Sequence, residues 1–178
     1  MTRKLLSLLI CLLALISPVY GETSGTETAG NVLTAAIPAL GAGMTFFKHD
    51  DPGKQQFLVS CLVSLGVSYG LDAATSNQRS TNEDNKGSFP SQHTAIAFQG
   101  ASFIHCRYGL EYALPAYAGA AFVGYSRLQA DKHYPEDVIA GAAIGFLSSY
   151  LFTTPYCGVQ IVPTVSNGNY LLNFLTSW

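Results

Sequence analysis

The chain has 178 residues, of which only 11% are charged and 48% are hydrophobic. Soluble domains carry about 25% charged residues, so this composition favours a membrane protein over an ordinary soluble enzyme. The net charge of −2 offers no basic surface for nucleic acid, and no nucleic-acid partner is expected. The length suits a single domain.

The N-terminus carries Arg3 and Lys4 ahead of an apolar run from Leu5 to Ile16. This order is typical of a secretory signal peptide or an uncleaved first membrane helix. We therefore divide the chain into a leader at 1–21, a main domain at 22–153 and a C-terminal tail at 154–178. Either kind of leader directs the following segment outward.

Apolar stretches recur along the main domain and, together with the leader, predict an all-α bundle of about six helices. Several are shorter than the ~20 residues of a perpendicular membrane span. They are rich in Gly and Ala, which favours tightly packed helices, and a soluble helical core is the alternative. The stretches are Asn31 to Phe47, Gln56 to Leu71, Thr94 to Ile104, Tyr112 to Tyr125 and Val138 to Phe152.

Positive charges alternate between these stretches in a way that indicates orientation. If every stretch spans a membrane, Lys48, Lys54 and Arg107 lie on the same side as Arg3 and Lys4, as the positive-inside rule prefers. Two histidine motifs, described next, then share the opposite side. The polar segment from 76 to 87 lies on that side too, as a gate or a plain connector.

The first histidine motif is SFPSQHT, at residues 88–94. Ser91 occupies a helix N-cap position before an apolar run, with His93 two residues later. Because a helix N-terminus offers unpaired backbone N–H groups and a positive dipole end, this segment predicts half of an anion site.

The second motif is SRLQADKHYPED, at residues 126–137. Five residues separate Arg127 from His133, and three separate His133 from Asp137. Pro135 suits the first position of a helix. A spacing of four on a helical first turn lets the Asp137 carboxylate reach the His133 ring and select its tautomer. A guanidinium and two histidines beside two helix N-termini point to phosphoryl chemistry.

The tail changes character. Two strand-like runs, Val159 to Val165 and Tyr170 to Leu175, flank Asn167-Gly168, a common hairpin turn. A short hairpin or an irregular tail is expected.

The two motifs resemble the type 2 phosphatidic acid phosphatase (PAP2) superfamily, whose members share a helical fold with bacterial acid phosphatases and vanadium haloperoxidases. The resemblance spans roughly residues 31–153, and the chain is most similar to the small membrane-type members of bacteria. The family pattern is a lysine and an arginine-proline pair, then proline-serine-glycine-histidine, then serine-arginine, five residues, histidine, three residues and aspartate. The matching positions are Arg79, Ser91, His93, Arg127, His133 and Asp137.

Three positions depart from the family pattern. Asp72 stands where the family has its phosphate-binding lysine, and its negative charge would repel phosphate. Ser80 replaces the proline, and Gln92 replaces the glycine that precedes the histidine. Lys86 is a candidate replacement for the missing positive charge.

The resemblance implies a site and a mechanism. It makes His133 the nucleophile, His93 the general acid and base, and Asp137 the residue that orients His133. Phosphate binding falls to the remaining motif positions, with no metal or cofactor. These positions are Arg79, Ser91, Gln92 and Arg127.

The predicted function is therefore that of a metal-independent phosphatase that hydrolyses a phosphate monoester or diphosphate through a phosphohistidine intermediate. The favoured substrate is a lipid phosphate or diphosphate. The expected location is the bacterial inner membrane with the site on the periplasmic face, or else a soluble periplasmic protein. The departures at Asp72, Ser80 and Gln92 motivate an alternative, a non-catalytic phosphate- or lipid-binding membrane protein on the same scaffold. Haloperoxidase activity ranks below both. The substrate and the oligomeric state stay open.

Overall fold

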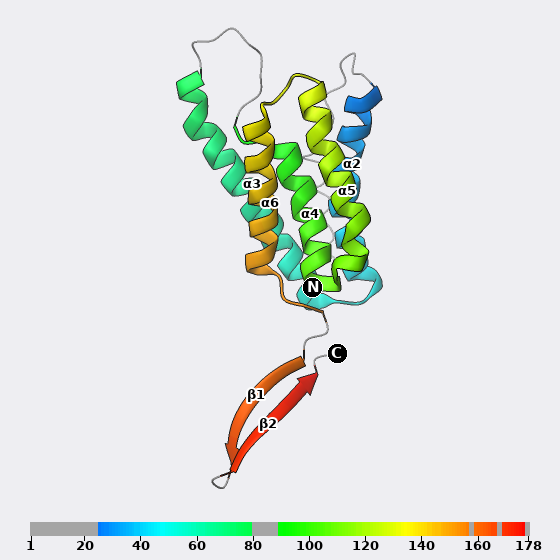
Figure 1. Cartoon of the computed structure of the whole chain (residues 1–178), viewed down its shortest axis with the longest axis vertical. Coiled ribbons are helices and arrows are strands. Elements are labelled where there is room, and N and C mark those ends of the chain that lie inside the picture. Colours follow the sequence, from blue (N-terminus) through cyan, green and yellow to red (C-terminus); the bar gives the residue numbers. More distant parts are fainter. Residues whose placement is uncertain (1–24, 80–88, 157–158, 167–168, 177–178) are drawn as a thin grey trace.

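The computed structural model describes residues 25–79, 89–156, 159–166 and 169–176. Within these ranges it contains a helical bundle followed by a two-stranded hairpin (Figure 1). The elements are α2 (Gly25–Phe47), α3 (Asp51–Arg79), α4 (Gln92–Tyr108), α5 (Leu110–Gln129), α6 (Pro135–Phe152), β1 (Val159–Ser166) and β2 (Asn169–Thr176).

Five helices in the described part correspond to five of the roughly six expected segments. The remaining one, the leader at 1–21, lies outside the described residues, so its assignment stays a prediction. The helices extend beyond the apolar runs that indicated them, into polar and glycine-containing sequence at both ends of the runs. The largest difference is in α3, which runs to Arg79, so the polar segment predicted as a loop from Ser76 begins inside a helix.

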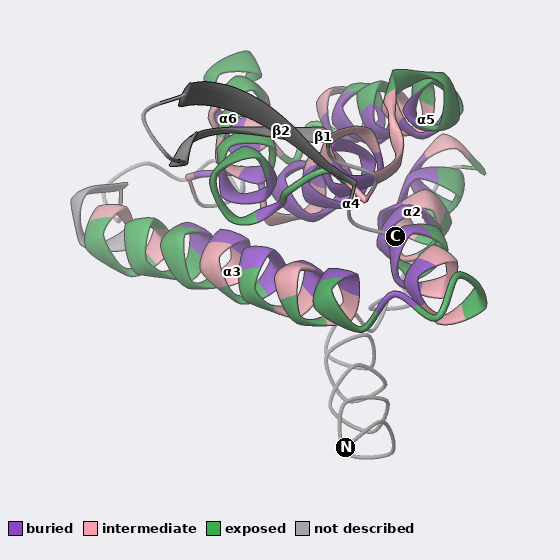
Figure 2. Ribbon diagram, turned by 90° about the horizontal axis from the view of Figure 1, so that it is seen from below, coloured by how far each residue is buried: buried purple, intermediate pink, exposed green. Residues whose placement is uncertain are grey.

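Helix α4 lies in the middle of the bundle, surrounded by α2, α3, α5 and α6 (Figure 2). Its residues are buried on every side, including Ala97, Phe103 and Ile104, none of which is exposed. Most of the buried residues around it are also small. The Gly- and Ala-rich stretches therefore pack tightly, as expected.

The contact between α4 and α6 depends on two glycines. A Cβ at Gly141 would lie 2.4 Å from the carbonyl oxygen of Ser91, and one at Gly145 would lie 2.2 Å from that of Ala95. Only glycine permits this approach of the two backbones. It brings the N-terminal ends of α4 and α6 together, and both histidine motifs lie at those ends.

Helix α3 turns a row of serines inward, beside the buried Phe57 and Cys61, and exposes several apolar side chains on its outer face. Ser60, Ser64 and Ser68 are buried, whereas Leu62 and Val67 are 47% and 43% exposed. By length and composition, α2 and residues Asp51–Thr75 of α3 are each long and apolar enough to cross a membrane. An apolar outer face over a polar, small-residue interior is the pattern of membrane helices.

The tail forms the expected hairpin. Strand β1 pairs with β2 in antiparallel register, from Val159 opposite Thr176 to Ser166 opposite Asn169. Figure 1 shows the hairpin beyond the end of α6, away from the histidine motifs. The turn dipeptide Asn167-Gly168 lies outside the described residues.

Candidate active site

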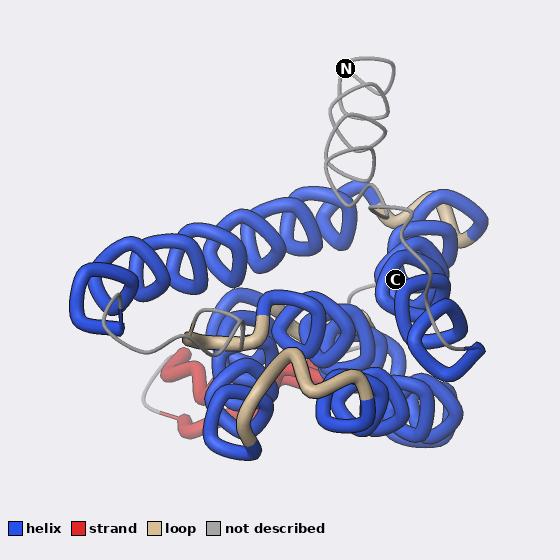
Figure 3. Tube along the Cα trace, turned by 90° about the horizontal axis from the view of Figure 1, so that it is seen from above, coloured by secondary structure: helices blue, strands red, loops and turns tan. Residues whose placement is uncertain are grey.

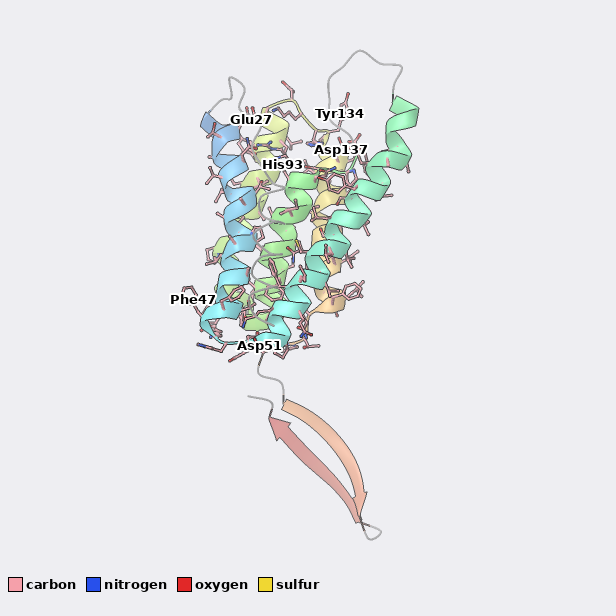
Figure 4. The ribbon with its side chains drawn as sticks, turned by 180° about the vertical axis from the view of Figure 1, so that it is seen from behind. Glu27, Phe47, Asp51, His93, Tyr134 and Asp137 are labelled. Atoms are coloured by element: carbon pink, nitrogen blue, oxygen red, sulfur yellow. The ribbon has the colours of Figure 1, made fainter. Side chains whose placement is uncertain are left out.

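The two histidine motifs lie together at one end of the bundle. Figure 4 shows His93, Tyr134 and Asp137 at this end, and Phe47 and Asp51 at the other. The backbone N–H of Ser91 donates to the carbonyl oxygen of Asp137 at 3.0 Å, which joins the motifs directly. Seen from this end, the loop between α5 and α6 lies beside the segment that leads into α4 (Figure 3).

The first motif forms the start of α4. Ser91 is the N-cap, with an extended backbone and no exposed surface. Its hydroxyl is 2.9 Å from that of Thr94 and makes no capping bond to the backbone. His93 is the second helical residue, so the backbone N–H groups beside it lack intrahelical acceptors. The helix begins where the sequence predicted, and such a terminus favours anions. That it binds one stays a prediction.

The second motif forms the start of α6. Pro135 is the first helical residue and Tyr134 the N-cap, so His133 precedes the helix instead of lying on its first turn. Nδ1 of His133 is nevertheless 3.7 Å from Oδ2 of the fully buried Asp137. The same oxygen accepts from the N–H of Tyr134 at 2.9 Å, which holds the carboxylate in place.

Arg127 is buried in the last turn of α5, with 2% of its surface exposed. Its Nη2 donates to the carbonyl oxygen of Glu27 and to the hydroxyl of Ser126, both at 3.1 Å. Among the described residues, the acceptors of Arg127 are neutral oxygens. Its positive charge is therefore not cancelled by a contacting carboxylate there. Helices α2 and α5 approach closely beside Arg127, because a Cβ at Gly30 would lie 2.0 Å from Oγ of Ser126.

Two charged residues that the sequence analysis missed complete this end of the bundle. Glu27, in the first turn of α2, is 6% exposed and forms an ion pair with Lys132. Lys132 stands directly before His133, so its position in the motif was a usable signal. Glu27 belongs to no motif, and 105 residues separate it from Lys132, so only the tertiary fold reveals it.

These charges act on His93. Burial, followed by the positive charges of Arg127, His133 and Lys132, lowers the pKa of His93 from 6.5 to about 4, while Glu27 opposes the shift. The ring is neutral at pH 7 while no anion is bound.

The residues that depart from the family pattern have separate positions. Nε2 of Gln92 lies 3.5 Å from Oδ2 of Asp72, so two of the departures face each other between α3 and α4. The Gln92 side chain thus lies near a carboxylate, and its role in phosphate binding stays a prediction. Arg79 is the last residue of α3, and its side chain is not described; Ser80 and Lys86 lie outside the described residues.

No metal site is found in the part of the chain that the structure covers. No group of three or more His, Cys, Asp or Glu side chains there is placed to hold an ion. Cys61 and Cys106, the two cysteines in that part, are free thiols.

Comparisons with known proteins agree with these motifs. The sequence model of the PAP2 superfamily matches residues 56–156. The lipid A 4'-phosphatase of Helicobacter pylori is 30% identical over 169 residues, which cover 86% of this chain and 85% of that protein. The lipid A 1-phosphatase of Porphyromonas gingivalis is 43% identical over 63 residues, 34% of this chain and 14% of that protein. The crystal structure of Aquifex aeolicus LpxE is 22% identical with a TM-score of 0.49, covering 80% of this chain and 92% of that one.

The matches define the class of protein as a phosphoric monoester hydrolase. The chain belongs to the PAP2 superfamily, as its motifs indicated.

Proposed function

We propose that the chain is a metal-independent phosphatase that hydrolyses a lipid phosphate at a membrane surface through a phosphohistidine. One observation carries the proposal. The hydrogen bond from Ser91 to the carbonyl of Asp137 joins two motifs that are distant in sequence, which supports a shared site for His93, His133 and Arg127.

In the first step, His133 attacks phosphorus. Its Nδ1 faces Asp137, which leaves Nε2 for the attack. The new P–N bond replaces the ester P–O bond, and His93 donates its proton to the leaving oxygen. The buried carboxylate of Asp137 stabilises the positive charge that develops on the His133 ring.

In the second step, water replaces the histidine. His93, now neutral, takes a proton from the water as its oxygen bonds to phosphorus. The P–N bond breaks, and neutral His133, protonated His93 and inorganic phosphate result. This exchange of roles requires that His93 gain a proton before the first step.

The lowered pKa of His93 fits this requirement through substrate binding. In the empty site the ring is neutral at pH 7, because its pKa is about 4. A phosphate dianion beside the ring adds negative charge, which favours the imidazolium form. Binding of the substrate therefore raises the pKa of His93 and favours the protonated ring that acts as the general acid.

Phosphate binding falls to Arg127 and to the start of α4. Arg127 provides a buried guanidinium whose described partners are neutral. Ser91 and the backbone N–H groups of Gln92 and His93 provide donors at a helix N-terminus. Arg79, the last residue of α3, is assigned to phosphate binding by its motif position alone. Because the Gln92 side chain faces Asp72, we assign Gln92 its role through the backbone.

We propose a glycolipid phosphate monoester, of the kind in lipid A, as the substrate. The two relatives are named for the 4'- and 1-phosphates of lipid A. The exposed apolar side chains of α3 fit a bilayer, and a site at the end of the bundle meets lipid head groups. Lys48, Lys54 and Arg107 lie toward the opposite end, which fits a bacterial inner membrane with the site on the periplasmic face.

The test compares the detergent-solubilised protein with His133→Ala in EDTA, on lipid A, phosphatidic acid and a polyprenyl diphosphate. We expect phosphate release by the wild type, loss by at least 10³-fold in His133→Ala, and wild-type rates in the control His105→Ala, since catalytic groups account for effects of this size. His105 lies in the last turn of α4, at the far end. An acid-labile, alkali-stable phosphoenzyme should form in the wild type. Equal release by His133→Ala, or loss of activity in EDTA, contradicts the proposal.

A further inference from the structure

A buried carboxylate at a phosphate site needs an explanation. Glu27 is 6% exposed, and its backbone carbonyl accepts from the Arg127 guanidinium at 3.1 Å. Figure 4 places Glu27 at the same end of the bundle as His93. Its negative charge alone would oppose a phosphate dianion, because Coulomb repulsion is strong in a poorly solvated site.

Lys132 neutralises the charge of the Glu27 carboxylate and is also hydrogen-bonded to Arg127. The backbone N–H of Lys132 donates to the carbonyl oxygen of Arg127 at 3.1 Å, while the Lys132 ammonium pairs with Glu27. Glu27, Arg127 and Lys132 thus form a closed set of contacts among α2, α5 and the loop before α6.

The Lys132 side chain retains donors for a further partner. An ammonium group has three N–H donors, and Glu27 Oε1 accepts one of them. The side chain is 51% exposed, so its ammonium is accessible to a ligand that enters the site. Figure 4 labels Glu27 and His93 at the same end of the bundle, so the Lys132 ammonium on Glu27 lies at the end that carries the proposed acid.

We propose that Lys132 is a phosphate-binding residue and that Glu27 is the positioning residue that holds its ammonium over the site. One N–H of Lys132 stays on Glu27 while the others donate to phosphate oxygens. This assignment rests on the proposed function, since it concerns the same anion site. It also gives the site a second cation beside Arg127, although Asp72 stands where the family has a lysine.

The experiment measures binding of inorganic phosphate to the detergent-solubilised full chain by titration calorimetry, beside the KM for the lipid substrate. Lys132→Met should weaken phosphate binding on the order of tenfold or more, because it removes a charge-assisted hydrogen bond. Lys132→Arg should restore most of the affinity. Lys48→Met, at the far end of the bundle, should bind phosphate like the wild type.

A double-mutant cycle tests the role of Glu27. Glu27→Gln should weaken phosphate binding when Lys132 is present and have little effect in the Lys132→Met background. A purely structural ion pair would instead lower the unfolding temperature in both variants and leave phosphate affinity unchanged in the folded protein.

The outcomes separate this proposal from the proposed function. Loss of turnover on every lipid phosphate, with phosphate binding still dependent on Lys132, overturns the proposed function and supports the Lys132 assignment. Unchanged affinity in folded Lys132→Met overturns the assignment, and so does a wild-type protein that binds no phosphate.

Discussion

Each end of the bundle buries an arginine, and the two arginines have different partners. At the far end, Nε of Arg107 donates to Asp50 at 2.7 Å, and its Nη1 donates to the carbonyl oxygen of Thr154 at 2.7 Å. Tyr108 also donates to Asp50, at 3.0 Å. At the histidine end, the described acceptors of Arg127 are a backbone carbonyl and a hydroxyl.

The comparison separates a structural arginine from one that is available to a ligand. Arg107 joins the end of α4 to the α2–α3 loop and to the segment after α6, and its charge is matched by Asp50. Arg127 is equally buried, but the oxygens that accept its described hydrogen bonds are neutral, and the nearby Glu27 carboxylate forms its ion pair with Lys132. Burial of a charge without a counter-ion is costly, and such a residue is explained when an anionic substrate completes its environment.

The largest expected effect comes from removing each arginine in turn. Arg127→Ala should lower kcat/KM on the order of 10³-fold, because it removes a cation from the transferring phosphoryl group. Arg107→Ala should instead lower the free energy of unfolding by about 3–5 kcal/mol, since Asp50 stays buried without its partner. Rates per folded protein and denaturant unfolding in detergent measure the two quantities. Reversed effects would break the comparison.

The sequence predicted the parts of the site that depend on local spacing. His133 and Asp137 are four residues apart, so any helix beginning near Pro135 brings them close. The position of Ser91 before an apolar run placed the N-cap correctly, although its hydroxyl contacts Thr94 instead of capping the backbone. Likewise, the alternation of apolar stretches with the two motifs predicted that both motifs share one end of the bundle.

The sequence could not predict contacts that arise only from packing. Arg107 and Asp50 are 57 residues apart, and no pattern links them. Glu27 meets Lys132 because α2 packs against α5, which depends on the close approach at Gly30. The end of α3 was misjudged because hydrophobic periodicity stops near Leu71. The helix continues to Arg79, and contacts of its last turns with the segment that leads into α4, such as that of Thr75 with the carbonyl oxygen of Phe89 at 3.2 Å, arise only from packing.

Substitution of one glycine beside each arginine should give smaller effects of the same two kinds. A Cβ at Gly30 would lie 2.0 Å from Ser126 Oγ and 3.0 Å from Nη2 of Arg127, so Gly30→Ala should displace the guanidinium and lower kcat/KM by about tenfold. A Cβ at Gly53 would lie 2.1 Å from Oδ2 of Asp50, so Gly53→Ala should lower stability instead. Steady-state rates and thermal unfolding distinguish them.

Gly70→Ala is the matched control for both variants. Nothing lies within 4 Å of a Cβ built at Gly70 in α3. Alanine is preferred over glycine inside a helix, so this variant should keep full activity and be no less stable than the wild type. Loss of activity in Gly70→Ala equal to that in Gly30→Ala would show that the effect of Gly30 is not specific to the site.

The smallest expected effect is the pH dependence of stability that His93 contributes. Its pKa is about 4 in the folded chain, below the 6.5 of an ordinary histidine, so the unfolded chain takes up the proton first as the pH falls. The contribution of His93 to the free energy of unfolding is therefore fully present above about pH 6.5 and is lost as the pH falls from about 6.5 to about 4. From the pKa difference, this contribution to the free energy of unfolding is at most about 3 kcal/mol. Because the ring is partly exposed, solvent screening reduces it to about 1–2 kcal/mol.

Denaturant unfolding of the wild type and of His93→Gln across this pH range measures the contribution as a difference between the two proteins. Saturating phosphate should shrink that difference, because a bound dianion favours the protonated ring and raises the pKa of His93. A difference that stays the same with phosphate would mean that the anion binds away from His93. Arg127 would then not belong to the phosphate site. The arginines at the two ends of the bundle would no longer differ in their availability to a ligand.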